Sequence, residues 1–319
     1  MFSLPLKQTE RVDYSKSLHR FVEESYSLEQ ADEHRDAFAA VQTLREKVRT
    51  ATLTEKGAEE TVRLIARYYR VLTSVRTRFG TAVDDSDGRA MFMWRDAWKT
   101  NEKCVLCDLQ FERAAVLFNL AAALSYLGTV QKRSDADGLR RACQRFQQAA
   151  GALALLKGLE ISDDVTGDLG EDAIEVWQTL MLAQAQQCFF EKAAKDKLKP
   201  GVVARLAAQV ATLYGTAADG LREAKLHTDK SWPQLLAWHV STFQAWTQLH
   251  AAAEHVEAFE YGAQVARLSH AQGLMGDVVK TCKDGRTPEA QASYFNEASD
   301  VVRHAAADAV RHNLSLIHI

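Results

Sequence analysis

Residues that interrupt helices are scarce in this sequence of 319 residues. Only 16 glycines occur, and the four prolines stand at positions 5, 200, 233 and 288. Because proline and glycine both weaken helix interiors, their scarcity favours long helices. The one β-like pattern lies in Ala90–Trp98, where Met91 and Met93 alternate with Phe92 and Trp94, typical of a strand or an extended loop. The sequence therefore predicts an all-α protein with a single extended segment.

Three further absences narrow the class of protein. No run of about twenty apolar residues occurs, so no transmembrane helix is expected. Basic and acidic residues nearly balance, at 39 and 42, which argues against a nucleic-acid partner. The start, Met1–Leu6, lacks the charged and apolar regions of a signal peptide, and the five cysteines are an odd number. These features indicate a reducing, cytoplasmic setting.

Motifs that carry catalysis or bind cofactors are also missing. The sequence has no P-loop, no dinucleotide-binding glycine turn and no nucleophile elbow. Cys104 and Cys107 have the spacing of half a zinc site, but no second pair matches them. His250 and His255 flank Glu254 without forming the HExxH spacing. We therefore expect no enzyme activity, no catalytic residue, no cofactor and no metal.

Helical periodicity covers most of the chain, with a break at Gly80–Gly88. The segment Leu109–Leu127 is apolar on nearly all sides, which predicts a central helix. Lys199-Pro200-Gly201 separates two long helices, and proline suits the first turn of the second. The predicted helical segments are Leu18–Tyr26, Phe38–Val48, Val62–Val75, Leu109–Leu127, Leu139–Leu159, Asp168–Leu198, Val202–Lys225, Leu235–Cys282 and Pro288–Val310.

The helix that starts at Val202 carries two apolar stripes. One consists of Val202, Leu206 and Leu213, and the other lies about 100° around the helix, at Val203, Val210 and Tyr214. This surface is wide enough to pack on a core and leave one edge exposed. Periodicity alone favours the plainer interpretation, in which both stripes are buried.

Two adjacent phenylalanines in the preceding helix raise the same question. Phe189 and Phe190 point about 100° apart, so they cannot face the same neighbour. Cations surround them, at Lys192, Lys195, Lys197, Lys199 and Arg205. An apolar strip with a basic border could accept an acidic amphipathic helix. The alternative is a solvated face with pairs such as Glu191 with Lys195.

An ordered set of motifs resembles the Bro-one domain family of Alix and the rhophilins. It includes Pro5-Leu6-Lys7, Tyr68-Tyr69, Arg78-Phe79, Phe92-x-Trp94-x-Asp96-Ala97, Phe111-Glu112-Arg113-Ala114, Phe118-Asn119, Phe146-Gln147, Met181–Ala193, Lys199–Gln209 and Tyr261-Gly262. The resemblance extends from Leu4 to Asn313, so a domain spanning residues 1–313 is expected. It implies an elongated, curved helical domain with a tetratricopeptide-like core and a small β-sheet near the N-terminus.

The resemblance also implies a function. Members of the family bind the C-terminal amphipathic helix of Snf-seven/CHMP-four-type ESCRT-III subunits, and the contact positions correspond to Phe189, Lys192, Val202 and Leu206. The expected protein is a non-enzymatic adaptor, recruited to endosomes through its partners during multivesicular body sorting. Two alternatives are a rhophilin-like or pH-signalling scaffold with a GTPase or receptor partner, and the non-catalytic part of a phosphatase-like protein.

The sequence departs from the family pattern in three places. Ala136 occupies a position that is acidic in some members, and Lys99–Leu109 is shorter than the apolar loop that some relatives use at membranes. The apolar end Leu314–Ile319 replaces the family's closing motif and equals one reading frame of a common sequencing adapter. We therefore expect a truncated domain with an artefactual tail at 314–319.

Overall fold

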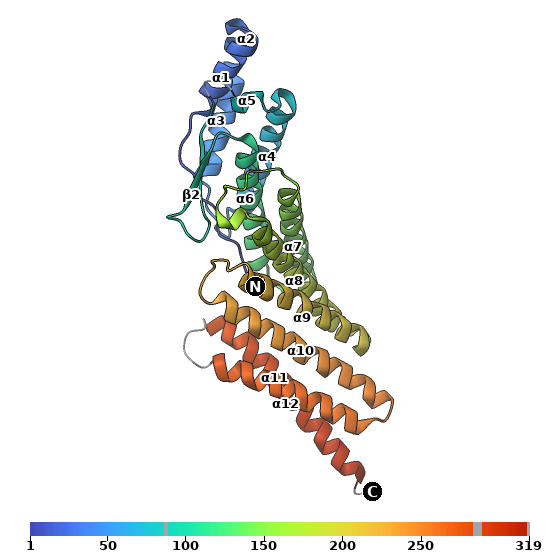
Figure 1. The fold of residues 1–319 in the computed structure, drawn as a ribbon. Helices are drawn as coiled ribbons and strands as arrows, with labels where there is room; N and C mark the ends of the chain where they lie inside the picture. The colour runs from blue at the N-terminus through green and yellow to red at the C-terminus, as the bar shows by residue number, and fades with distance from the viewer. Residues whose placement is uncertain (86–88, 283–288, 318–319) are drawn as a thin grey trace. The chain divides into compact units, whose positions relative to one another are not determined.

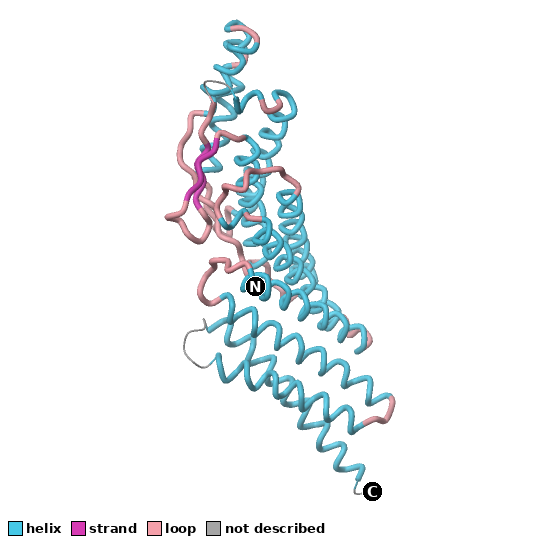
Figure 2. Tube along the Cα trace, in the orientation of Figure 1, coloured by secondary structure: helices cyan, strands magenta, loops and turns pink. Residues whose placement is uncertain are grey.

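The described part of the protein is predominantly helical, as the sequence predicts (Figures 1 and 2). A computed structural model describes residues 1–85, 89–282 and 289–317. The α-helices are α1 (Tyr14–Ser25), α2 (Leu28–Glu33), α3 (Arg35–Arg49), α4 (Ala58–Phe79), α5 (Ala82–Asp85), α6 (Leu109–Thr129), α7 (Ala136–Lys157), α8 (Glu171–Lys195), α9 (Pro200–Glu223), α10 (Trp232–Glu257), α11 (Tyr261–Cys282) and α12 (Glu289–Ile317). A short 3-10 helix, η1, covers Gly167–Leu169.

The chain forms two compact units. The first contains residues 1–131, 144–181 and 224–227, and the second contains residues 132–143, 182–223 and 228–319. Helices α7 and α8 contribute to both units. The first unit holds α1 to α6 and the sheet, and the second holds α9 to α12.

The sheet of the first unit has two antiparallel strands, β1 (Phe92–Arg95) and β2 (Lys103–Leu106). Trp94 lies opposite Cys104, and an isolated bridge joins Thr9 to Trp94. The predicted strand is confirmed, but its alternation is incomplete because Met93 is buried together with its neighbours. The second strand is not predicted from the sequence, whose only β-like pattern lies in Ala90–Trp98.

Helix α6 forms the centre of the first unit and is buried on nearly all sides, which confirms the prediction for Leu109–Leu127. One charged residue, Glu112, lies fully buried in it. The Glu112 carboxylate accepts hydrogen bonds from Arg45 Nε at 3.0 Å, Tyr68 OH at 2.8 Å and Trp94 Nε1 at 2.6 Å. This carboxylate therefore joins α3, α4, β1 and α6 at a single point.

In the second unit, successive helices pack against one another from α9 to α12. Pro200 begins α9 and Pro233 lies in the first turn of α10, as predicted. The predicted segment Leu235–Cys282 is two helices, because the chain turns at Phe259 with φ of 58°.

The short helices α2 and α5 were not predicted. Each has at most six residues, too few to show a helical period. Helix α5 lies inside the predicted break, of which residues 86–88 fall outside the described part. Pro288, the predicted start of the last helix, also lies outside it, as do the last two residues of the suspected tail.

Candidate partner-binding site

A tight turn links α8 to α9 and sets the direction of both helices. The N–H of Leu198 donates to the carbonyl of Ala193 at 3.1 Å, and the N–H of Lys197 donates to the carbonyl of Ala194 at 3.2 Å. Together with the left-handed φ of 53° at Lys197, these bonds form a Schellman motif, which satisfies carbonyls at the end of α8. The chain then reverses, and α9 starts at Pro200.

The two apolar stripes of α9 have different environments. Val203, Val210 and Tyr214 are buried in the second unit, with Val210 and Tyr214 completely inaccessible. Val202, Leu206 and Leu213 are only partly buried. The interpretation that periodicity alone favours, in which both stripes are buried, is therefore wrong. One edge of α9 retains accessible apolar side chains while the other edge fixes the helix in the core.

The two phenylalanines of α8 also separate as their spacing predicts. Phe190 is buried against α10, with its ring centroid 5.3 Å from Phe243 and 6.0 Å from Trp246. Phe189 keeps 46% of its surface exposed. Leu182, seven residues earlier on the same face of α8, is 40% exposed. Leu182 is not among the residues predicted for the site, although its i, i+7 spacing from Phe189 indicates that the two share one face of the helix.

These accessible side chains make up a surface that we call the α8–α9 strip, consisting of Leu182, Phe189, Val202, Leu206 and Leu213. A hydrogen bond from Tyr214 OH to Gln187 Oε1, 2.7 Å long, fixes how the two antiparallel helices align. Phe189 is therefore level with the α9 residues just before Tyr214. From Val202 to Leu213 the strip extends about 16 Å, or three helical turns.

A polar network, buried only in part, joins α8 to the segment that precedes α7. Gln187 Nε2 donates to Glu191 Oε1 at 2.8 Å, and Glu191 also pairs with Arg133. Lys195 Nζ donates to the carbonyl of Arg133 at 2.7 Å. The predicted pair of Glu191 with Lys195 is therefore wrong, because Arg133 occupies the carboxylate. The network therefore ties α8 to Arg133, which precedes α7 in the chain.

Exposed cations lie beside the strip. Lys192 is exposed and pairs with Asp196, one turn further along the chain. Lys197, Lys199 and Arg205 are exposed and form no ion pair within the described residues. The four residues predicted as a site, Phe189, Lys192, Val202 and Leu206, thus all reach solvent on two connected helices.

The five cysteines are free thiols in the structure. Burial raises the pKa of Cys188 to about 12, so this thiol stays protonated at neutral pH. Cys104 lies in β2 with its Sγ 3.0 Å from the carbonyl oxygen of Asp164. Within the described ranges, no group of three or more His, Cys, Asp or Glu side chains is placed to hold a metal ion.

The comparison with family models decides the identity of this fold. A model described as BRO1-like domain matches residues 1–318. The chain belongs to the BRO1-like domain family. The resemblance seen in the sequence motifs is thus confirmed.

Relatives of this BRO1-like domain include proteins whose names refer to vacuolar protein sorting. The chain is 33% identical over 274 residues to the ALG-2 interacting protein X of Dictyostelium discoideum, covering 84% of this chain and 34% of the relative. It is 30% identical over 319 residues to the vacuolar protein-sorting protein bro-1 of Neurospora crassa, covering 99% of this chain and 30% of the relative. The chain therefore spans about a third of the length of these relatives.

A solved structure confirms the fold of the BRO1-like domain. The ALIX BRO1 CHMP4C complex matches with a TM-score of 0.88 and 28% identity, covering all of this chain and 89% of the ALIX chain. In the described part of the BRO1-like domain, no helix combines the length and apolar character that a membrane crossing requires.

Proposed function

We propose that this BRO1-like domain is a non-enzymatic adaptor that binds the C-terminal amphipathic helix of a CHMP-type ESCRT-III subunit. The observation that carries the proposal is the α8–α9 strip, whose apolar side chains stay accessible although Phe190 and the second apolar stripe of α9 are buried. The likeness to the ALIX BRO1 domain in complex with CHMP4C supports this partner class. Phe189, Lys192, Val202 and Leu206 are the proposed contacts.

The geometry suits a helical partner. Three turns of accessible apolar surface match the length over which an amphipathic helix presents anchors at i, i+3, i+4 and i+7. The unpaired cations Lys197, Lys199 and Arg205 favour acidic residues beside those anchors. Both helices of the strip are already formed and joined by the Tyr214–Gln187 hydrogen bond, which lowers the conformational entropy that binding of a partner would cost.

The proposed setting is the cytoplasmic face of endosomes. The domain would reach the membrane through its ESCRT-III partner during multivesicular body sorting. Relatives named as vacuolar protein-sorting proteins support this setting over a rhophilin-like or pH-signalling scaffold. The parts of the relatives that lie beyond this domain would bring further partners.

Titration with a fluorescent peptide of a CHMP4-type C-terminal helix tests the proposal. We expect saturable binding that Val202→Asp and Phe189→Ala each weaken at least tenfold, since a central anchor contributes about 2 kcal/mol. Lys192→Glu should weaken binding less and reduce its dependence on salt. Absence of binding by the folded wild-type domain would reject the ESCRT-III assignment.

A further inference from the structure

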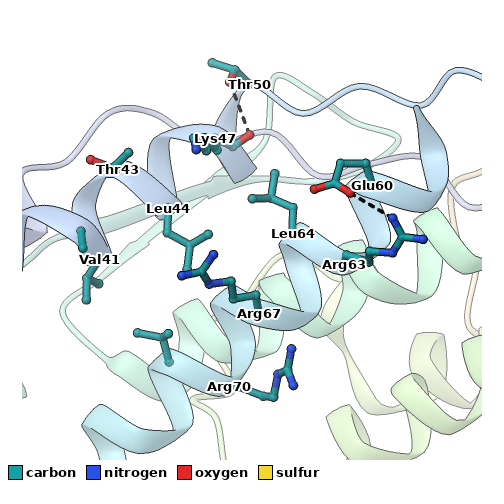
Figure 3. Close-up of a pocket in the computed structure, with 12 residues that line it drawn as sticks. Val41, Thr43, Leu44, Lys47, Thr50, Glu60, Arg63, Leu64, Arg67 and Arg70 are labelled. Carbon is teal, nitrogen blue, oxygen red and sulfur yellow. Dashed lines mark hydrogen bonds and ion pairs between the residues drawn. The ribbon is translucent and has the colours of Figure 1, made fainter. Parts of the chain in front are cut away.

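A second accessible surface lies within the first unit, between α3 and α4 (Figure 3). The two helices pack against each other and leave a groove of about 1010 Å³ above their line of contact. Apolar side chains form its floor, at Val41, Leu44, Leu64 and Val71. Cations form its borders, at Lys47, Arg63, Arg67 and Arg70. We call this surface the α3–α4 groove.

The sequence of α4 places the cations in one row. Arg63, Arg67 and Arg70 follow i, i+4, i+7 spacing and are all exposed. Leu64 and Val71, each one residue after an arginine, are partly buried and line the same groove. Figure 3 shows Leu44 and Leu64 in the gap between the helices, with Arg67 extending from α4 toward Leu44. An apolar row therefore lies directly beside a cationic row.

Three of the four cations have no acidic partner among the described residues. Arg63 is the exception and pairs with Glu60 at 3.2 Å. Across residues 1–85, 89–282 and 289–317, no ion pair involves Lys47, Arg67 or Arg70. Arginines one turn apart repel one another and destabilise a helix by a few tenths of a kcal/mol. A bound acidic ligand would remove this repulsion and at the same time cover the apolar floor.

We propose that the α3–α4 groove binds an acidic amphipathic helix of a partner protein. From Glu60 to Val71 the groove extends about 16 Å, enough for three turns of a third helix packed on α3 and α4. The apolar stripe of the partner would contact Leu44 and Leu64, while its carboxylates would pair with Lys47, Arg67 and Arg70. An anionic membrane fits less well, because headgroups in a plane would contact the arginines but leave the recessed floor empty.

The test uses a designed peptide of fifteen residues. It carries leucines at i, i+3, i+7 and i+11 with glutamates on both sides, and a second peptide replaces every glutamate with glutamine. The titrated protein carries Leu206→Asp, which should remove binding at the proposed α8–α9 strip, so that the proposed function and this groove are tested separately. We expect saturable binding of the acidic peptide and binding about tenfold weaker for the glutamine peptide.

Variants of the groove locate the binding site. Arg67→Glu with Arg70→Glu should weaken binding of the acidic peptide at least tenfold, and Leu64→Asn should weaken it independently of salt. Arg78→Glu is the matched control, because Arg78 is an exposed arginine of α4 outside the groove, and it should leave the affinity unchanged. Circular dichroism checks that each variant is folded.

Three results would overturn the inference. They are no saturable binding of the acidic peptide, equal binding by the Arg67 and Arg70 variant, and tight binding to phosphatidylserine vesicles without binding of the peptide. The last result would identify the arginine row as a membrane contact.

Discussion

Replacing Glu112 with leucine should strongly destabilise the first unit. The variant removes the acceptor of three buried donors and leaves the Arg45 guanidinium without its carboxylate. Both side chains of this pair are essentially inaccessible to solvent. Loss of one member of a buried ion pair costs about 3–5 kcal/mol, because the remaining charge is uncompensated. We expect a loss of this size in the free energy of unfolding.

The double variant Arg45→Met with Glu112→Leu separates charge from packing. It removes the stranded cation, but Tyr68 OH and Trp94 Nε1 still lose their acceptor, at about 1–3 kcal/mol each. Arg45 also donates to the carbonyl of Glu10 at 3.0 Å, and this bond is lost. The double variant should therefore be less destabilised than the sum of the two single variants, by about 1–3 kcal/mol.

Urea unfolding followed by tryptophan fluorescence measures these differences, and Trp94 is one of six tryptophans that contribute to the signal. The slope of the transition shows whether each variant unfolds in the same manner as the wild type. If the losses of the two single variants sum to that of the double variant within about 0.5 kcal/mol, Arg45 and Glu112 are not coupled. A cost of less than about 1 kcal/mol for Glu112→Leu would refute the central role of the carboxylate.

Two further predictions concern the second unit. Phe190→Ala should lower the free energy of unfolding by about 3–5 kcal/mol because it leaves a cavity against α10. Phe189 is half exposed, so Phe189→Ala should lower it by less than about 1 kcal/mol. Urea unfolding of both variants compares the two losses, and equal losses would contradict the placement of the two rings. Burial holds the pKa of His239 well below its ordinary value of 6.5, so below pH 6.5 the unfolded state gains a proton that the folded state does not. The free energy of unfolding should therefore fall as pH drops from 6.5, by up to about 1.4 kcal/mol per pH unit. Urea unfolding at pH 7.5, 6.5 and 5.5 measures this dependence, which His239→Gln should reduce. The same pH dependence in wild type and variant would contradict a neutral, buried His239.

The sequence predicts the helical framework well because its long helices carry strong periodic patterns. Leu109–Leu127 is apolar on nearly all sides and becomes the buried helix α6, and Pro200 marks the start of α9. Strand β2 escapes prediction, since four residues with alternating partial exposure show no distinct pattern without their partner strand. The separation of α10 from α11 depends on the backbone at Phe259, which residue types there do not reveal.

The candidate site is less evident from the sequence alone. The helical wheel of α9 identifies two stripes but cannot tell which one is buried, because that depends on contacts with α8 and α10. The family resemblance supplied the choice of Val202 and Leu206, and their partial exposure agrees with it. The pairing of Glu191 with Arg133 joins residues 58 positions apart, so local i, i+4 reasoning chose the wrong partner.

The central claim is that the α8–α9 strip binds an ESCRT-III helix, and a paired titration tests it most directly. Leu206→Asp and Leu155→Asp each place a charge at an accessible leucine, since Leu155 on α7 is 60% exposed and lies outside the strip. Both variants should keep wild-type helicity. The account predicts that a CHMP4-type C-terminal helix loses measurable affinity for Leu206→Asp and keeps its full affinity for Leu155→Asp. Undiminished binding by folded Leu206→Asp would contradict it.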